Sequence, residues 1–177
     1  TQALSDIADP TGDHVSYANL LAEMQDEHWN ERDCRDRFAS YTALQRALEV
    51  KHQLAGVLRQ FGRIHKSAGI VRGTSRHSRD DHQDLRSIAI RRCVTAGFFF
   101  NVARRSNDGR YYTLRNSVLV TPSPSSILST HGSVTVPADY IVFCETLDGP
   151  RGGGIELKSV SVIEARWLRE LAPHYWD

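Results

Sequence analysis

Arginine is the residue whose number and position most clearly suggest a chemistry for this chain. Its planar guanidinium group forms paired hydrogen bonds with phosphate oxygens and stacks on flat rings. Cations gather between residues 59 and 110, where the only acidic residues are Asp80, Asp81, Asp84 and Asp108 and the basic ones are Arg59, Arg63, Lys66, Arg72, Arg76, Arg79, Arg86, Arg91, Arg92, Arg104, Arg105 and Arg110. Residues 1–33 are acidic, so the net charge is only +1. The asymmetry suggests a polyanionic partner for the middle of the chain, although a biased genomic composition would produce the same excess of arginine.

Residue patterns typical of catalysis are missing from the sequence. No GxxxxGK[ST] phosphate-binding loop occurs, because the glycines at 152–154 are followed by Ile155 and not by a lysine. No GxSxG, HExxH or paired CxxC motif occurs, and only His77 and His82 come near the spacing of metal ligands. The three cysteines lie far apart, which argues against a disulfide framework and suggests a reducing intracellular compartment. We therefore expect a binding module with no catalytic centre and no metal site.

The elements that must position these arginines change character near residue 105. Before it, apolar residues recur at helical spacing and predict helices over about 14–25, 35–61 and 80–104. Asp13 is expected to cap the first helix, and a flexible basic connector of residues 63–81 is expected before the third. The predicted apolar stripe of the third helix comprises Leu85, Ile88, Ala89, Cys93, Ala96, Phe99, Phe100 and Ala103.

After the turn signal at residues 107–109, the chain has the pattern of short β-strands. The predicted strands are Arg110–Leu114, Ser117–Val120, Ser133–Val136, Tyr140–Thr146 and Glu156–Val162, and a short helix follows over Glu164–Leu171. None of the connections is long enough for a helical crossover, so the strands favour a small five-stranded barrel. The expected fold class is α+β, with an N-terminal α-helical bundle segment before the barrel. No apolar run reaches the length of a membrane span, so no membrane partner is expected.

Small barrels of this kind often bind single-stranded nucleic acid by combining a cationic groove with aromatic rings. The candidate residues for such a site are Arg91, Arg92, Arg104, Arg105, Arg110, Tyr112, Arg115 and Lys158. Strand alternation predicts that one of Tyr111 and Tyr112 is a core residue. The phenylalanines at 98–100 are most simply core residues that pack against the barrel and the neighbouring helices.

Several motifs, taken in order, resemble the C-terminal part of the DEAH-box RNA helicases. The segment RRCVTAGFFFNVAR at residues 91–104 looks like that family's RKALCAGFFxNAAR. Gly12-Asp13-His14 resembles the start of its GDHLTLLN motif, and residues 34–54 resemble the helical segment after it. Residues 112–114, 124–128 and 167–175 are similar to its YxTL, HPSSxL and WLxELAPxY motifs, with Ser123 in place of the histidine. The resemblance spans almost the whole chain.

The resemblance implies that residues 1–104 end a helical-bundle (ratchet-like) domain and that residues 105–177 form an oligonucleotide-binding fold. It adds Ser125 and Ser126 to the RNA-binding candidates. It implies upstream ATP-hydrolysing domains that would hold ATP and Mg²⁺, whereas this chain would hold no cofactor and be inactive alone. The expected partners are single-stranded RNA and the upstream helicase domains of the same chain. The expected location is the nucleus, in pre-mRNA splicing or ribosome biogenesis.

Two alternatives stay open at this point. The module could be a platform for regulatory proteins with little direct contact to RNA, because a barrel with a glycine-rich insertion at residues 148–154 suits that purpose. The chain could also fold and yet show neither activity without the missing domains.

Overall fold

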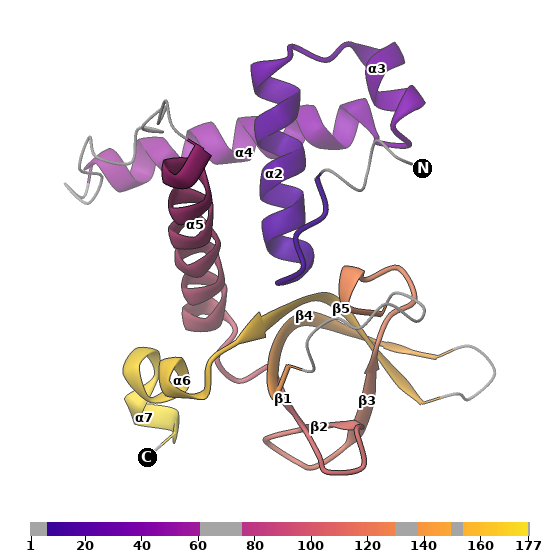
Figure 1. The fold of residues 1–177 in the computed structure, drawn as a ribbon, viewed down its shortest axis with the longest axis vertical. Coiled ribbons are helices and arrows are strands. Elements are labelled where there is room, and N and C mark those ends of the chain that lie inside the picture. Colours follow the sequence, from indigo (N-terminus) through magenta and orange to yellow (C-terminus); the bar gives the residue numbers. More distant parts are fainter. Residues whose placement is uncertain (1–6, 61–75, 130–137, 150–153, 177) are drawn as a thin grey trace. The chain divides into compact units, whose positions relative to one another are not determined.

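The structure, a computed structural model, describes residues 7–60, 76–129, 138–149 and 154–176 (Figure 1). The chain forms two compact units. The helical unit comprises Ala18–Asp81 with Thr1–Ile7, and the barrel unit comprises Ala8–Tyr17 with His82–Asp177. Among the described residues, no helix is long and apolar enough to cross a membrane.

Four of the described helices belong wholly or partly to the helical unit, and the last of them, α5 (Arg76–Gly97), continues into the barrel unit. Helix α2 (Asp13–Asp26) begins in the barrel unit and continues into the helical unit, in agreement with the first predicted helix. It is followed by α3 (Glu31–Asp36) and α4 (Tyr41–Gln60). The core of this unit is formed by side chains from α2, α3 and the segments beside them: Ile7, Met24, Trp29 and Cys34, with Leu44 and Leu48 of α4 packed against them.

The single helix predicted over residues 35–61 is wrong at its start, because the chain breaks between α3 and α4. Phe38 has a φ of 55°, in the left-handed region, and its side chain is 86% exposed. Residues 31–36 form α3 because Asn30 and Asp33 make a capping box at its first turn. The left-handed backbone at Phe38 therefore lies between the end of α3 and the start of α4.

The barrel consists of β1 (Val102–Arg105), β2 (Tyr111–Thr113), β3 (Leu119–Pro122), β4 (Tyr140–Asp148) and β5 (Ile155–Ile163). The strands close in the order β1-β2-β3-β5-β4, and only the β3–β5 pair is parallel. A 3₁₀ turn, η2 (Ile127–Ser129), follows β3, and helices α6 (Ala165–Leu171) and α7 (Pro173–Trp176) follow β5. The predicted five-stranded barrel and the short helix after it are confirmed. The predicted strand Ser133–Val136 lies outside the described residues.

The sequence assigned β1 to the end of a helix, and this was wrong. Helix α5 (Arg76–Gly97) ends seven residues before the predicted position near residue 104, and the chain then enters the barrel as β1. Its start at Arg76 also falls inside the segment predicted as a connector, of which residues 63–75 lie outside the described residues. Val102 packs in a core outside the barrel and Ala103 in the core inside it. Because Val102 and Ala103 are buried on opposite faces, the first half of β1 lacks the apolar–polar alternation that would have revealed the strand.

The buried face of α5 is polar, contrary to the predicted apolar stripe. Ser87, Arg91 and Thr95, four residues apart, are buried, whereas Leu85 is 63% exposed and Cys93 is exposed. Most of this polar face is hydrogen-bonded within the barrel unit: the hydroxyl oxygens of Thr11 and Ser87 lie 3.0 Å apart, Arg91 Nη1 donates to Val162 O at 3.1 Å, and Thr95 Oγ1 donates to Arg91 O at 2.7 Å. Arg91 Nε is buried without a hydrogen-bond partner among the described residues. Ile88, Val94 and Phe98 form the apolar contacts with the outer core instead.

Residues 8–17 belong to the barrel unit because they are hydrogen-bonded to it. Gly12 has a φ of 129°, and a Cβ there would lie 2.4 Å from Val160 O. The carboxylate of Asp13 accepts hydrogen bonds from Ser126 Oγ at 3.1 Å, Ile127 N at 2.8 Å and Val160 N at 2.8 Å. The predicted N-cap role of Asp13 is wrong, because these donors belong to η2, the residue before it and β5, not to α2.

The compact units divide between residues 81 and 82, whereas the sequence placed its domain boundary at residue 104. The two divisions differ because α5 packs against the outer core of the barrel, which joins it to that unit by contact. The domain boundary at residue 104 follows from the resemblance to the family and not from contacts within this chain, so it stays a prediction.

Candidate nucleic-acid interface

A row of outward-facing side chains crosses the barrel where β1 pairs with both of its neighbours. Arg104 of β1 lies opposite Tyr112 of β2 on one side and Tyr140 of β4 on the other. Tyr112 in turn lies opposite Leu119 of β3. The row faces outward because Val102, two residues before Arg104, points to the outer core. We call Tyr140, Arg104, Tyr112 and Leu119 the outer row.

The two adjacent tyrosines of β2 point in opposite directions, as strand alternation predicted. Tyr111 packs against the inner core and its hydroxyl donates to Ala138 O at 2.8 Å. Burial raises the pKa of the Tyr111 phenol, so this group stays protonated at neutral pH. Tyr112 faces outward and its hydroxyl donates to Asp108 Oδ2 at 3.2 Å. The prediction that one of the two is a core residue is confirmed.

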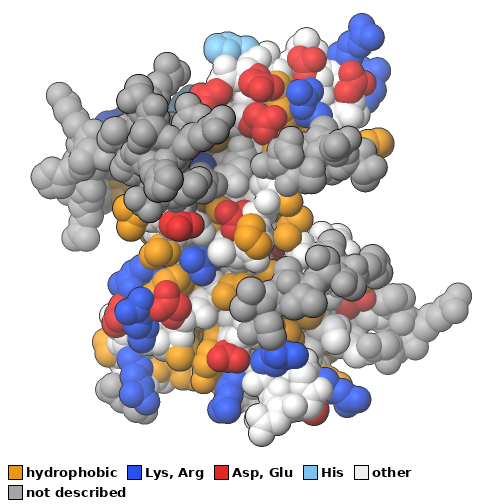
Figure 2. All heavy atoms as spheres, in the orientation of Figure 1, with side chains coloured by type: hydrophobic (Ala, Val, Ile, Leu, Met, Phe, Trp, Pro, Cys, Tyr) orange, Lys and Arg blue, Asp and Glu red, His pale blue; other side chains and the backbone are white. Residues whose placement is uncertain are grey.

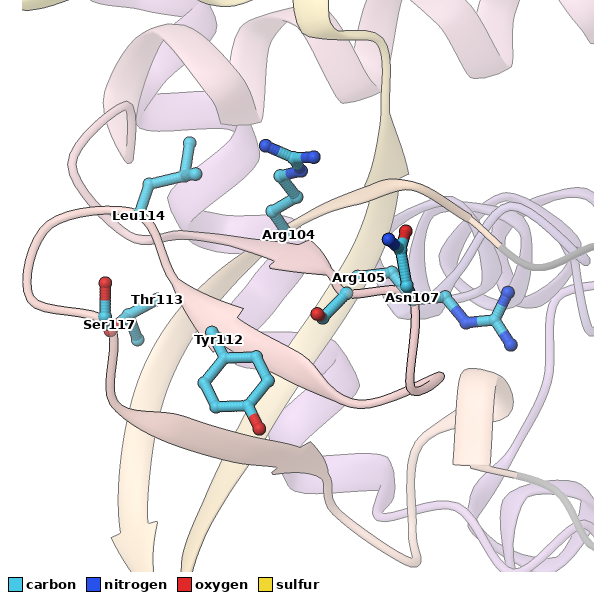
Figure 3. Close-up of a pocket in the computed structure, with 8 residues that line it drawn as sticks. Arg104, Arg105, Asn107, Tyr112, Thr113, Leu114 and Ser117 are labelled. Atoms are coloured by element: carbon cyan, nitrogen blue, oxygen red, sulfur yellow. The ribbon is translucent and has the colours of Figure 1, made fainter.

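An open groove of about 340 Å³ lies beside the outer row. It is lined by residues of β1, β2 and the turns after them: Arg104, Arg105, Ser106, Asn107, Tyr112, Thr113, Leu114 and Ser117. Figure 3 shows the Tyr112 ring and the Thr113 and Ser117 side chains on one side, and Arg104 on the neighbouring strand. The lining offers an aromatic ring, guanidinium groups and small polar groups, which are the groups that hold bases and phosphates.

The cations around the groove lie in different surroundings. Arg104 is exposed, and Arg105 is half-buried with its Nε donating to Gly109 O at 3.4 Å. Arg110 and Arg115 are exposed, on the turns before and after β2. The backbone N–H of Arg110 donates to Asp108 Oδ1 at 3.0 Å, and this bond chiefly lowers the pKa of that carboxyl group. Figure 2 shows that, on the visible face of the barrel unit, cationic side chains are interspersed with hydrophobic ones.

The structure does not bring the other predicted RNA-binding residues to this groove. Arg91 is 9% exposed, its guanidinium lies 5.2 Å from the centre of the Trp167 ring, and burial lowers its pKa. Arg92 forms an ion pair with Glu170 at 2.7 Å.

The remaining three candidates lie on β5 and in the segment between β3 and η2. Ser126 is buried and donates to Asp13, and Ser125 is exposed with its Oγ 3.2 Å from Ser123 Oγ. Lys158 is exposed on β5, opposite Glu145 of β4. A contact of any of the five with RNA stays a prediction, and Arg91 and Ser126 already have structural partners.

Sequence reasoning missed Tyr140 and the small groove residues Ser106, Asn107 and Ser117. Tyr140 joins the outer row only because β1 pairs with β4, and the sequence predicted no strand at β1. Asn107 carried only a turn signal, which does not distinguish a binding loop from an ordinary hairpin, and Ser117 was the first residue of a predicted strand.

A second polar cluster, around His14, lacks the features of a catalytic pair. His14 Nδ1 lies 2.9 Å from Ser161 Oγ, and Nε2 lies 3.1 Å from Cys144 Sγ. Burial lowers the pKa of the histidine and raises that of the Cys144 thiol, so both groups are neutral near pH 7. An imidazole and a thiol that are both neutral do not form the thiolate–imidazolium pair of a nucleophilic site. The described part of the chain also holds no group of three or more side chains that could bind a metal ion.

The closed five-stranded barrel, with its strand order β1-β2-β3-β5-β4, has the architecture of an oligonucleotide/oligosaccharide-binding (OB) fold. Residues 90–175 match the oligonucleotide/oligosaccharide-binding (OB)-fold family, which fits this architecture. Over 94% of its length the chain is 30% identical to the probable ATP-dependent RNA helicase DHX35 homolog of Caenorhabditis elegans and 28% identical to the probable ATP-dependent RNA helicase DHX35 of Homo sapiens. It is 25% identical to the pre-mRNA-splicing factor ATP-dependent RNA helicase DEAH10 of Arabidopsis thaliana, again over 94% of its length.

The chain corresponds to the C-terminal OB-fold region of the DEAH-box RNA helicases, together with the helical segment before it. It spans about a fifth of the length of these relatives, 20% of the two DHX35 proteins and 22% of DEAH10.

Proposed function

We propose that the chain is the accessory module of a DEAH-box ATP-dependent RNA helicase that grips single-stranded RNA at the groove beside β1 and β2. In this proposal the module forms one wall of the RNA channel and couples RNA to the ATPase domains of the same helicase. The observation that carries it is the meeting of Arg104, Arg105 and Tyr112 at one open groove of the barrel. Neither arginine forms an ion pair with any described side chain, so both guanidinium groups are available to phosphate.

The cellular role is proposed from the relatives. All three are named as ATP-dependent RNA helicases, and the Arabidopsis relative is also named as a pre-mRNA-splicing factor. We propose a role in RNA remodelling, in splicing or ribosome biogenesis, and therefore in the nucleus. ATP and Mg²⁺ would be held by other domains of the parent helicase, which we propose to be an NTP hydrolase.

Binding to oligo-U at increasing salt tests the RNA-gripping role. Arg104→Glu combined with Arg110→Glu is expected to weaken binding by the 177-residue chain at least tenfold. It should also lower the slope of log affinity against log salt by roughly 0.7 for each phosphate that the variant no longer binds. Arg32→Glu combined with Arg46→Glu is the matched control, because both arginines are exposed on helices of the helical unit. Equal weakening in both double variants, or no salt-sensitive binding by the unmodified chain, would contradict the proposal.

A second groove favours the alternative of a protein-binding platform. This groove, of about 620 Å³, is lined by residues of α6, α7 and the adjoining strands: Leu114, Tyr140, Ala165, Arg166, Leu168, Arg169, Glu170 and Trp176. Its lining is more aliphatic and aromatic than that of the first groove, which is the character of peptide-binding surfaces. Retention of a regulatory protein by the Arg104/Arg110 double variant, with no RNA binding by the unmodified chain, would support this alternative.

A further inference from the structure

We propose that residues 145–148 of β4 bind an extended, basic segment of a partner protein as an additional β-strand. We call these four residues the free edge. The proposal goes beyond the RNA-gripping function and does not depend on it, because the free edge contributes no residue to the groove beside β1 and β2. It also differs from the groove at α6 and α7, because the contact is made by backbone groups and not by an apolar lining.

Strand β4 is paired along one side for nearly its whole length and along the other side only at its start. On the first side β5 pairs with β4 from Tyr140 to Asp148, apart from Cys144. On the other side β1 pairs only with residues 140–142, and Asn101, which precedes β1, donates from Nδ2 to Cys144 O at 3.2 Å. Beyond that point no described strand lies beside β4, and Figure 1 shows the hairpin of β4 and β5 projecting from the barrel.

Two hydrogen bonds show which backbone groups of the free edge point away from β5. Leu157 O accepts a hydrogen bond at 2.9 Å from the segment after β3, so the backbone of Leu157 faces β3 and its partner Thr146 faces away from β5. Gly149 N donates to Gly154 O at 2.7 Å, so Asp148, one residue earlier, also faces away. The backbone N–H and C=O groups of Thr146 and Asp148 therefore have no hydrogen-bond partner among the described residues.

These groups are accessible to another chain, because all four residues of the free edge are exposed. An open edge of this kind receives an extended peptide, which forms backbone hydrogen bonds with the unpaired groups. The side chains beside the edge then select the sequence of the peptide. Leu147 is 40% exposed and shares its face of the hairpin with Glu145, so the edge favours a peptide that alternates apolar and cationic residues.

The charge of the hairpin favours a basic partner. Its described residues carry three carboxylates, those of Glu145, Asp148 and Glu156, and one ammonium group, that of Lys158. None of these groups forms an ion pair with another described residue. A second copy of the chain would bring like charges together along the paired edges, and RNA would bring phosphates to carboxylates. A basic peptide meets neither repulsion.

The test titrates the 177-residue chain with a short peptide that alternates lysine and valine, and with a glutamate–valine peptide of the same length. We expect the lysine peptide to bind at least tenfold more tightly, with an affinity that falls as salt is added. Methylation of alternate backbone nitrogens of the lysine peptide should weaken binding roughly tenfold on the register that faces β4, because it removes the N–H donors. Isothermal titration calorimetry measures the affinities.

Substitutions on the free edge separate its backbone from its charge. Thr146→Pro removes the outward N–H and keeps the ladder with β5, so it should weaken binding of the lysine peptide roughly tenfold. Thr146→Val keeps that N–H and should retain the affinity. Glu145→Gln combined with Asp148→Asn should weaken binding about threefold or more. Asp36→Asn combined with Glu49→Gln is the matched control, because both carboxylates are exposed on helices of the helical unit.

The outcomes separate strand addition from the other uses of this edge. Equal affinities for the lysine, glutamate and methylated peptides would overturn the proposal and leave the RNA-gripping function intact. Self-association that Thr146→Pro abolishes would assign the edge to a second copy, and loss of oligo-U binding in that variant would assign it to RNA; either result overturns the proposal. If Thr146→Pro loses its folded circular dichroism spectrum, the comparison of methylated and unmethylated peptides on the unmodified chain decides the question.

Discussion

Two pairs of adjacent arginines, Arg91–Arg92 and Arg104–Arg105, have opposite roles in the same unit. In the first pair, Arg91 is buried and donates to Val162 O, and Arg92 is paired with Glu170. In the second pair, both residues line an open groove. Both pairs suggested phosphate binding in the sequence. Their difference shows that the neighbours which the fold brings to an arginine decide whether its charge is available to a ligand.

Trp167 explains much of the difference. Its ring lies 5.2 Å from the guanidinium of Arg91 and 5.7 Å from that of Arg92, so both cations lie over one indole. Trp167 itself is 1% exposed and belongs to the outer core. The first arginine pair therefore helps to pack α5 against α6. Arg104 has two tyrosines beside it in the barrel, and these remain partly open.

Among the tests of this comparison, the largest effect is expected on stability when Arg91 is replaced. Arg91→Ala is expected to lower the free energy of unfolding of the barrel unit by about 2–3 kcal/mol, because it leaves Val162 O unpaired and removes the cation from Trp167. Urea titration followed by tryptophan fluorescence measures the change. A decrease under about 0.5 kcal/mol would mean that Arg91 is a surface cation after all.

A smaller effect is expected for the half-exposed pair of Arg92 and Glu170. Their side chains are 37% and 46% exposed, so solvent screens the ion pair, whose Nη1 and Oε2 atoms are 2.7 Å apart. A double-mutant cycle with Arg92→Ala and Glu170→Ala should give a coupling free energy of about 0.5 kcal/mol that shrinks at high salt. A coupling as large as the effect at Arg91 would contradict the distinction between the two adjacent arginines.

The smallest effect on stability is expected at Arg104. Arg104→Ala removes no ion pair among the described residues, so the unfolding free energy should change by less than about 0.5 kcal/mol. The same urea titration measures it, and RNA affinity is measured in parallel. A variant that keeps its stability and binds RNA more weakly would complete the contrast with Arg91. A large decrease in stability would remove it.

Apolar periodicity in the sequence was sufficient to predict some helices and strands and misleading for others. Helix α4 and four of the five strands were recognisable because each is amphipathic or bounded by turn residues. The break at Phe38 was not recognisable in the sequence, because apolar residues at helical spacing do not reveal a residue in the left-handed region. Strand β1 was missed because its apolar residues continue those of α5, and Val102 and Ala103 are buried on opposite faces.

The sequence by itself determined the α+β class, the small barrel and the family, since these depend on local periodicity and on motifs that can be read along the chain. Tertiary structure alone decided which arginines are free. Arg91 and Arg104 have the same side chain, and their difference lies in partners distant in sequence, such as Val162 and Tyr140. The outer row was hidden for the same reason, because its members come from four strands and become neighbours only when the barrel closes. Cross-strand register is a non-local property, and no window of sequence contains it.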